Sequence, residues 1–482
     1  MIPERFKERM KKLLGEEYGA FIGALESEDA VRGLRINLLK CPRERFLERT
    51  DLSLSPLPYT DIGFILDSDS PVGNLAIHHA GIIYMQDPGA MAPLSSVDIP
   101  RGSRVLDLCA APGGKSTQAA AMIGNEGFLL SNEYVPKRAK ITVGNFERLG
   151  LRSAMVTSMD TARLGELFQE YFDFIIADVP CSGEGMFRKN EEAGAEWSEG
   201  EVKACAVRSR EILENAHRLL KPGGVIIYST CTWSLEENEM TVWDFLSSHP
   251  DFHLIEAKRE IVSCTSDGIS YLGKESEALR MCRRFYPHVS QGEGQFLALL
   301  CRDGDREPKE RVLYRDRFIP LTKKEAETVD AFLRNTLTKM PEGRIGRLRP
   351  PEDSSRAKRR ESSARYEKGA VPKEGENIVI IPHAPPPPPD SVFMCGVLLG
   401  ELKGNIITPS HQFFSAYGAD FKRRLDLSDD EERLGKYLSG EEIDAPDTEN
   451  GYCAVEYLGA TVGGGKVSAG RVKNHYPKGL RN

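Results

Sequence analysis

The sequence contains no segment that would carry the chain into or across a membrane. No run of about 18 consecutive apolar residues occurs, although a membrane-spanning helix needs roughly 20 of them. The N-terminal stretch MIPERFKERMKKLLGEEYG is charged throughout and lacks the apolar region of a secretory signal peptide. We therefore expect a soluble protein that acts in the cytoplasm and does not contact a membrane.

The cysteine spacing argues against two further classes of protein. Ten cysteines are present but no CxxC pair occurs, so their spacing fits neither a zinc site nor a dense disulfide framework. Cysteine in a cytosolic protein is usually reduced and buried. We expect that state for most of the ten, and we predict no metal site.

Two common nucleotide-binding patterns are also missing. The dinucleotide fingerprint GxGxxG does not occur. The segment GGKST resembles the end of a phosphate-binding P-loop, but that motif requires glycine at the position of Cys109. An NTPase and a dinucleotide-binding enzyme are therefore both disfavoured.

Strand and helix patterns alternate through the middle of the chain. Short runs of β-branched and apolar residues predict strands at 103–108, 128–132, 154–158, 172–179 and 224–230. Helical patterns between them run from Lys115 to about Ile123, from Pro136 toward Leu149 and from Glu201 to Leu220. Strands at 252–257 and 294–301 are expected to add a closing pair. This alternation predicts the α/β class with a doubly wound, mostly parallel sheet.

The remaining composition divides the 482 residues into several domains. Residues 304–390 contain a basic stretch at 343–373 and five consecutive prolines from Pro385 to Pro389, which favour an extended spacer. Short strands with glycine turns follow, which indicates a small β-rich module. The predicted domains are an N-terminal lead-in at 1–85, the α/β core at 86–303, an intermediate domain with linker at 304–390, and the C-terminal module at 391–482.

Charge is distributed unevenly along the chain. The formal net charge of −8 argues mildly against a nucleic-acid partner, because phosphate contacts need Lys and Arg. Residues 343–373, however, carry ten Lys/Arg against four acids, and residues 463–482 carry five and no acid. Distribution matters more than the total, so basic faces that bind RNA are expected.

Specific basic residues are candidates for RNA contacts. In the tail, Tyr476 is expected to stack on a base beside them. For Arg188 and Lys189, a solvated surface loop is an equally good interpretation. The candidate RNA-binding residues are Arg188, Lys189, Lys466, Arg471, Lys473 and Lys478.

Polar residues follow the predicted strands at the edge where open α/β sheets bind ligands. The first strand leads into Gly113 and Gly114, which allow a ligand to approach the backbone. Glu133 follows the second strand, where an acid commonly holds ribose hydroxyls. Asp160 follows the third strand and Asp178 ends the fourth. An S-adenosylmethionine site fits all three acids.

Two cysteines are expected at the same rim. Cys181 follows the fourth strand and Cys231 the fifth, and these strands are commonly neighbours in a doubly wound sheet. A cysteine inside a strand is ordinarily a small buried hydrophobe. Just past a strand end it faces a cleft, and two such cysteines beside Asp178 favour chemistry.

These groups suit the methylation of cytosine at carbon 5. That carbon becomes nucleophilic when a thiolate adds to carbon 6, which is covalent catalysis. A carboxyl group near ring nitrogen 3 stabilises the charge that develops there. After methyl transfer from a sulfonium, a base removes the proton at carbon 5 and the thiol leaves. From the residues alone, either cysteine could attack, and the target base must be flipped out or single-stranded.

The same segments resemble the motifs of the Sun/NSUN family of RNA cytosine-5 methyltransferases. VLDLCAAPGGKSTQ is similar to the first cofactor motif, DVPCSGEGMFRK to the fourth, and LLKPGGVIIYSTCTWSLEENE to the fifth and sixth. LRINLLK and YMQDPGAMAP are similar to the lead-in segments. RMCRRFYPHVSQGEGQFLALL and GRVKNHYPKGLR resemble the RsmF branch, whose members methylate a small-subunit ribosomal RNA cytidine near the decoding site. The likeness covers nearly the whole chain, and residues 304–390 only loosely.

This resemblance implies a role for individual residues. Cys231 would be the nucleophile, Cys181 would assist product release, and Asp178 would contact the cytosine. Val179 stands where the family often has alanine, and its side chain should point away from the rim. The C-terminal module resembles a PUA-like RNA-binding domain. The implied cofactor-binding residues are Cys109, Ala110, Ala111, Pro112, Gly113, Gly114, Lys115, Glu133, Asp160 and Asp178.

Two other functions stay open at this point. One is the same reaction on transfer RNA, because the motifs do not read the substrate. The other is a non-catalytic RNA-binding factor in ribosome assembly, which predicts a lost cysteine or a broken cofactor loop. RNA or the ribosomal subunit is the expected partner, and a monomer is expected, although the sequence carries no direct indication of oligomeric state.

Overall fold

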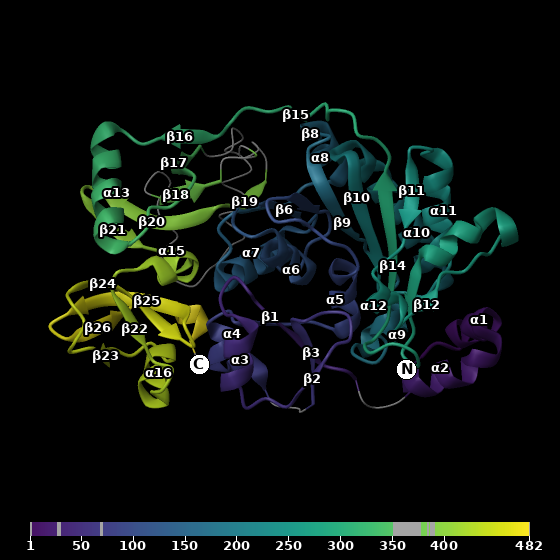
Figure 1. The fold of residues 1–482 in the computed structure, drawn as a ribbon, viewed down its shortest axis with the longest axis horizontal. Helices are drawn as coiled ribbons and strands as arrows, with labels where there is room; N and C mark the ends of the chain where they lie inside the picture. The colour runs from purple at the N-terminus through teal and green to yellow at the C-terminus, as the bar shows by residue number, and fades with distance from the viewer. Residues whose placement is uncertain are drawn as a thin grey trace.

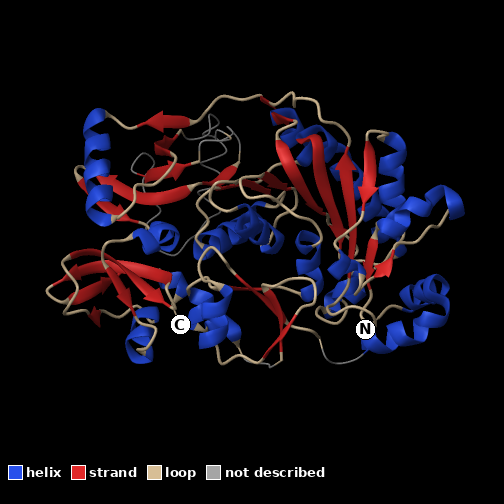
Figure 2. Ribbon diagram, viewed as in Figure 1, coloured by secondary structure: helices blue, strands red, loops and turns tan. Residues whose placement is uncertain are grey.

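The computed structural model describes residues 2–26, 30–67, 71–349, 377–382, 385 and 391–481 (Figure 1). One large mixed sheet carries helices on both of its faces, and smaller sheets flank it (Figure 2). The predicted basic stretch at 343–373 and proline run at 385–389 lie outside the described residues, except for 343–349 and Pro385.

The large sheet contains every strand predicted for the core. Its order is β12-β13-β14-β10-β9-β5-β6-β7-β19. The strands β10, β9, β5, β6 and β7 are parallel to one another, and β14 is antiparallel to β10. The expected closing pair forms between β11 and β14. The core strands are β5 (Arg104–Asp107), β6 (Phe128–Asn132), β7 (Ala154–Thr157), β9 (Phe172–Asp178), β10 (Leu220–Thr230), β11 (Phe252–Ile255), β12 (Ser266–Asp267), β13 (Arg283–Phe285) and β14 (Gln295–Arg302).

Alternate strand residues face opposite layers of helices, as a doubly wound sheet requires. Leu106 and Leu130 lie in the core cluster that contains α8, α10 and α11. Their neighbours Val105 and Leu129 lie in a second cluster, with α5, α6 and α7. The predicted α/β class is therefore confirmed. The helices are α5 (Pro88–Ser95), α6 (Gly114–Ile123), α7 (Pro136–Leu149), α8 (Thr161–Leu167), α10 (Glu199–Leu219) and α11 (Glu239–Ser248).

The helix ends follow local signals in the sequence. Pro136 occupies the first turn of α7, and Gly150 caps its C-terminus with φ 72°. Ser198 caps α10 by accepting the Glu201 N–H. These caps fix where both helices begin and end, and so where the adjoining strands start.

The two ends of the chain share one hydrophobic core. An N-terminal sheet of order β2-β3-β1-β4 packs its Leu34 and Ile36 in the same cluster as Val455 and Val467 of a C-terminal sheet. The partly buried Lys40 ammonium joins them by donating to carbonyl oxygens of the C-terminal half, including that of Ser415 at 2.7 Å. The strands are β1 (Gly33–Ile36), β2 (Leu54–Pro56), β3 (Gly63–Leu66) and β4 (Ile83–Met85), then β22 (Arg424–Asp426), β23 (Ile443–Asp444), β24 (Gly451–Tyr457), β25 (Ala460–Ser468) and β26 (Arg471–Asn474).

A further sheet crosses the domain boundary predicted at residue 390. Strands from both sides of that position join in the order β16-β17-β18-β20-β21, and β19 (Val392–Cys395) pairs with β7 of the core. The segment after residue 390 therefore completes two sheets before the C-terminal module begins. The other strands are β16 (Phe318–Pro320), β17 (Arg344–Leu348), β18 (Asn377–Ile381), β20 (Val397–Lys403) and β21 (Ile406–Pro409).

Among the described residues, none of the helices combines the length and apolar character needed to cross a bilayer.

Candidate active site at the strand ends

The carboxyl ends of β5, β6, β9 and β10 bring most of the predicted catalytic and cofactor-binding residues to one rim. Because β9 lies between β5 and β10, Asp178 at its end has the β5 loop on one side and Cys231 on the other. Ser229, opposite Asp178 in the β9–β10 register, donates its hydroxyl to the Asp178 Oδ1 at 2.7 Å. The rim therefore gathers residues from four separate stretches of sequence.

The loop after β5 forms a backbone cradle around buried acids. Gly113 has φ 104°, a left-handed conformation that favours glycine, and it leads directly into α6. Glu133 is 3% exposed and accepts the Ala111 N–H at 3.3 Å and the Val135 N–H at 3.0 Å. The Glu133 carboxylate is thus aimed at the loop after β5, from the end of the neighbouring strand.

Asp160 has a different local role from Glu133. It is exposed and caps α8, because its Oδ1 accepts the Ala162 N–H at 2.8 Å. Its second carboxylate oxygen has no such role in the helix. The structure therefore leaves Asp160 at the rim, beyond the end of β7, with one oxygen committed to the helix.

The two cysteines lie in direct contact. Their sulfur atoms are 3.1 Å apart, and the Cys231 N–H donates to the Cys181 Sγ at 3.3 Å. Both side chains are partly exposed. The hydrogen bond with Cys231, together with burial, holds the pKa of the Cys181 thiol well above its usual range. Cys181 is thus expected to stay protonated near neutral pH.

An ion pair lies beside the cysteines. The Lys115 ammonium is 2.8 Å from the Asp178 Oδ2, and its side chain is 9% exposed. Burial opposes the charge on Lys115, but attraction to Asp178 outweighs it and raises the lysine pKa. Gln295 approaches the same carboxylate from β14, with its Nε2 at 3.5 Å from Oδ1. Asp178 is therefore held in one orientation with part of its surface open to the rim.

Two buried glutamates connect the Cys181 loop to the Cys231 loop. Neither was predicted from the sequence. Glu237 accepts the N–H of Ser182 at 2.8 Å and also its hydroxyl, which contacts Thr232. Glu184 accepts the N–H of Trp233 at 2.8 Å, so each loop carries an acid that binds the other. Burial raises the pKa of Glu237 to about 8, against the lowering effect of the Ser182 hydrogen bonds. In the sequence, the signal that could have revealed these two glutamates is an acidic residue a few positions after each cysteine.

Known protein families and relatives match this chain. A family model for the 16S rRNA methyltransferase RsmB/F matches residues 96–301, and models for the N-terminal and PUA domains of RsmF match 2–88 and 424–482. The ribosomal RNA small subunit methyltransferase F of Vibrio parahaemolyticus is 31% identical over 99% of this chain and 97% of its own. The chain belongs to the RsmF family.

Other relatives agree with membership of the RsmF family. The methyltransferase F of Vibrio campbellii is 30% identical, again over 99% of this chain and 97% of its own. The crystal structure of a methyltransferase homologue from Pyrococcus horikoshii is 27% identical, with a TM-score of 0.55, and covers 62% of this chain and 95% of that one. As a member of the RsmF family, the chain is a methyltransferase, and the rim described above is its candidate active site.

Arg188, a candidate RNA contact, is buried instead. Its Nε donates to Glu293 at 2.6 Å, and the two side chains are 8% and 2% exposed. Its other nitrogens donate to the Ala24 and Gly292 carbonyls. These internal contacts join the Cys181 loop to the N-terminal helices, and a phosphate contact by Arg188 stays a prediction. Lys189 pairs with Asp87 at 2.7 Å and stays a prediction.

In the C-terminal module, the structure separates the tail candidates. Lys466 and Lys473 are exposed and directly opposite each other in β25 and β26. Arg471 is 58% exposed and lies 3.4 Å from Asp444, and Lys478 is exposed. Two like charges facing each other across a strand pair are unfavourable unless an anion lies between them.

Tyr476 does not stack on a base. It is 2% exposed, and its hydroxyl is 2.7 Å from the His79 Nδ1 of the N-terminal domain. Its ring packs against His411 and Tyr437. The sequence-based expectation for Tyr476 was wrong, because the residue belongs to the core that the two chain ends share.

Asp107 gives a stability prediction with a defined pH window. Burial raises the pKa of this carboxyl to about 7, although the Ser116 hydroxyl at 2.6 Å opposes the shift. The folded chain therefore holds a proton that the unfolded chain releases near pH 4, so stability falls as pH rises from about 4 to about 7. In Asp107→Asn this loss is absent, and the variant should gain roughly 2–3 kcal/mol on the wild type between about pH 5 and pH 8.

Urea unfolding of both proteins at the two pH values measures this effect. The exposed Asp305→Asn is the matched control and should track the wild type. A difference between Asp107→Asn and wild type that stays constant with pH would contradict the assignment.

Proposed function

We propose that this protein transfers a methyl group from S-adenosylmethionine to carbon 5 of a cytidine in small-subunit (16S) ribosomal RNA, through a covalent adduct with Cys231. The observation that carries the proposal is the contact of the Cys181 and Cys231 sulfur atoms, 3.1 Å apart beside Asp178. Covalent activation of a cytosine ring needs a thiolate, a fixed carboxyl group and a second group for release. Two thiols and one fixed carboxyl group lie together at the rim, which supports this proposal.

The residues at the rim fit S-adenosylmethionine. When bound, this cofactor supplies a methyl group on a positively charged sulfur. The buried Glu133 carboxylate would hold the ribose hydroxyls, and the Cys109–Gly113 backbone, with glycine at φ 104°, lets the ligand approach closely. Asp160 would contact the adenine edge. Asp178 lies between this cradle and the cysteines, which suits a residue close to both cofactor and base.

The protein groups account for each step on the base. The Cys231 thiolate adds to carbon 6, and a proton held between the Lys115 ammonium and the Asp178 carboxylate passes through Asp178 to ring nitrogen 3, where it neutralises the negative charge that develops. The S–C6 bond makes carbon 5 nucleophilic, and carbon 5 then takes the methyl group. In the release step solvent water takes the proton from carbon 5, ring nitrogen 3 returns its proton to Asp178, and the S–C6 bond breaks, which regenerates the Cys231 thiolate. Cys181, in contact with the Cys231 sulfur, assists this release.

Family membership supports ribosomal RNA as the substrate, because the relatives are named small-subunit ribosomal RNA methyltransferases. The match of residues 424–482 to the RsmF PUA domain supports an RNA-binding role for the C-terminal module. The cytoplasm, where the ribosomal subunit is found, is the proposed site of action.

Removing the facing lysines tests RNA binding by this module. We expect the double variant Lys466→Gln/Lys473→Gln to bind RNA more weakly and to lower the slope of log affinity against log salt by about 1.4–1.8, because two phosphate contacts disappear. Binding is measured by fluorescence anisotropy across a salt series. Lys323→Gln/Lys324→Gln, at the exposed start of α13 (Lys323–Thr336), is the matched control. An unchanged slope in the first variant would place the RNA elsewhere.

Bisulfite sequencing of ribosomal and transfer RNA tests the proposed reaction and substrate together. Cells with and without the gene are compared. Loss of a non-converting cytidine in small-subunit RNA is the expected result. Loss of a non-converting cytidine in transfer RNA instead would support the same reaction on a different substrate. No change in either RNA would instead favour a non-catalytic RNA-binding factor.

A further inference from the structure

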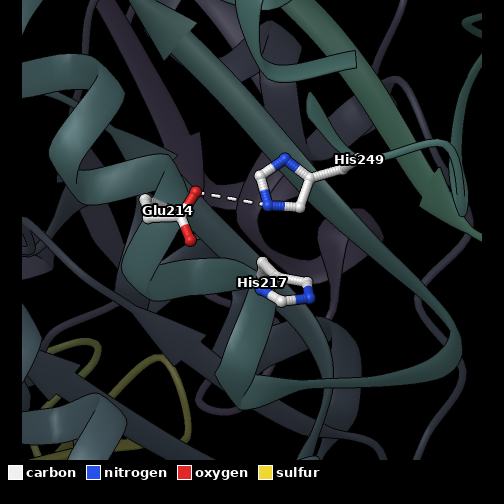
Figure 3. A group of neighbouring side chains, drawn as sticks. All are labelled: Glu214, His217 and His249. Atoms are coloured by element: carbon white, nitrogen blue, oxygen red, sulfur yellow. Dashed lines mark ion pairs between the residues drawn. The ribbon is translucent and has the colours of Figure 1, made fainter. Parts of the chain in front are cut away.

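Three side chains outside the active site converge on the face of the core that α10 and α11 cover (Figure 3). Glu214 and His217 are three residues apart on α10, so they lie on one face of that helix. His249 caps the end of α11. One ligand atom from each residue lies within 4.8 Å of the other two. Glutamate and histidine at this spacing form a common set of metal ligands.

The orientation of the His249 ring points its second nitrogen at Glu214. Its Nδ1 lies 3.0 Å from the Phe245 carbonyl oxygen, to which it donates, and the ring stacks on Phe245 with centroids 4.3 Å apart. Its Nε2 then faces the Glu214 Oε2 at 3.2 Å (Figure 3). With the proton on Nδ1, a neutral ring presents a lone pair to a carboxylate oxygen. This arrangement is favourable only if His249 takes up a second proton or a cation binds between the two groups.

His217 supplies a nitrogen that lacks a partner. Its Nδ1 is buried and makes no hydrogen bond to any described residue. Its ring centroid is 4.7 Å from that of His249. A buried nitrogen without a partner calls for an explanation, and a metal ligand is one.

We propose that Glu214, His217 and His249 bind a divalent transition-metal ion, Zn²⁺ in the first instance. Two imidazole nitrogens and one carboxylate oxygen, with water in the fourth position, form an established tetrahedral zinc site. Bonds of about 2.1 Å separate tetrahedral ligand atoms by roughly 3.4 Å, so the side chains must close by about 1 Å. Glu214 is 50% exposed, which gives it room to move and gives the ion a path from solvent.

The charges around the cluster are compatible with a cation. The Arg302 guanidinium, at the end of β14, pairs with Asp251 at 3.1 Å and also with Glu170. The ion would therefore face one net negative ligand and a neutralised arginine.

A metal here would brace the helices that flank the Cys231 strand. The chain runs from α10 into β10, whose last residue is Thr230, then through the Cys231 loop into α11. The proposed ion clamps the end of α10 to the end of α11, and so fixes both ends of this segment. The inference concerns metal binding and helix stability, and it holds whether or not the proposed methylation does.

Metal titration of the full chain tests the site. After chelator treatment, the wild type should take up one Zn²⁺ at this cluster, measured by elemental analysis, and Zn²⁺ should raise its Tm. Co²⁺ is the spectroscopic probe, because nitrogen and oxygen ligands give weak d–d bands without thiolate charge transfer. His217→Gln and Glu214→Gln should each weaken uptake by on the order of 100-fold. Glu214 is half-exposed, so its variant should fold even if His217→Gln does not.

His253→Gln is the matched control. His253 is a half-exposed histidine on β11 that pairs with Asp303, outside the cluster, so its loss should leave uptake unchanged. The proposal is overturned if the wild type takes up no zinc, or if Glu214→Gln binds as the control does. A strong thiolate charge-transfer band with Co²⁺ would move the metal to the cysteines and would equally overturn it.

Discussion

Cys231→Ala is expected to lower methyl transfer by roughly 10³-fold or more, because the covalent route to an activated carbon 5 disappears. The substituted side chain is partly exposed at the end of β10 and contacts the Cys181 sulfur, so the fold should survive. Turnover is measured by transfer of a labelled methyl group to 16S ribosomal RNA.

Cys181→Ala separates the two thiols. If Cys181 acts in release, this variant still attacks the base, and a protein–RNA adduct that resists denaturing electrophoresis should accumulate. Cys231→Ala should form no such adduct. Cys264→Ala, a partly exposed cysteine outside the rim, is the control and should turn over normally. Full turnover by Cys231→Ala together with its loss in Cys181→Ala would reverse the proposed roles.

Glu239→Gln is expected to produce the largest loss of stability, roughly 3–5 kcal/mol in the free energy of unfolding. Glu239 is fully buried and accepts two hydrogen bonds from Arg284, one from its Nε at 2.6 Å. Removing the negative charge leaves a buried guanidinium without its counter-ion. Arg284 also donates to the Trp233 carbonyl at 2.8 Å, so the loss should spread to the Cys231 loop.

Arg280→Gln is the matched control for this buried pair. Arg280 pairs with Glu277 at 2.8 Å, but the two side chains are 57% and 62% exposed. Exposed pairs contribute little to stability, so this variant should unfold as the wild type does. Urea unfolding gives both values. Equal, small losses in the two variants would show that the buried pair is not a major source of stability.

The elements that the sequence predicted well depend on local signals. Helix α7 begins at Pro136 and ends before Gly150, as its flanking residues indicate. The central strands are short, nearly continuous apolar runs that are buried on both faces of the sheet, and such runs are visible in the sequence. Cys181 and Cys231 were expected at one rim because parallel strands end at the same edge, and their sulfur atoms are in contact. Rules of this kind need only a short window of the chain.

The features that the sequence did not predict depend on distant partners. In the sequence, Arg188 is indistinguishable from an exposed loop charge. Its partner Glu293 lies more than a hundred residues later, and only the folded structure brings the two together. Tyr476 reads as a surface aromatic until the N-terminal domain covers it. Strand β19 follows the proline run, and no local pattern indicates that it pairs with β7. Each of these contacts is set by tertiary packing, which single-sequence patterns do not contain.

The core shared by the chain ends has a consequence for biosynthesis. His79 and Tyr476 are about 400 residues apart, and translation at about 5–20 residues per second separates their emergence by roughly 20–80 s. Throughout that interval the apolar face of the first sheet has no cover. A nascent chain would therefore need a chaperone at its first domain until the last residues leave the ribosome, and premature termination near the end of the message would leave that face exposed to proteolysis.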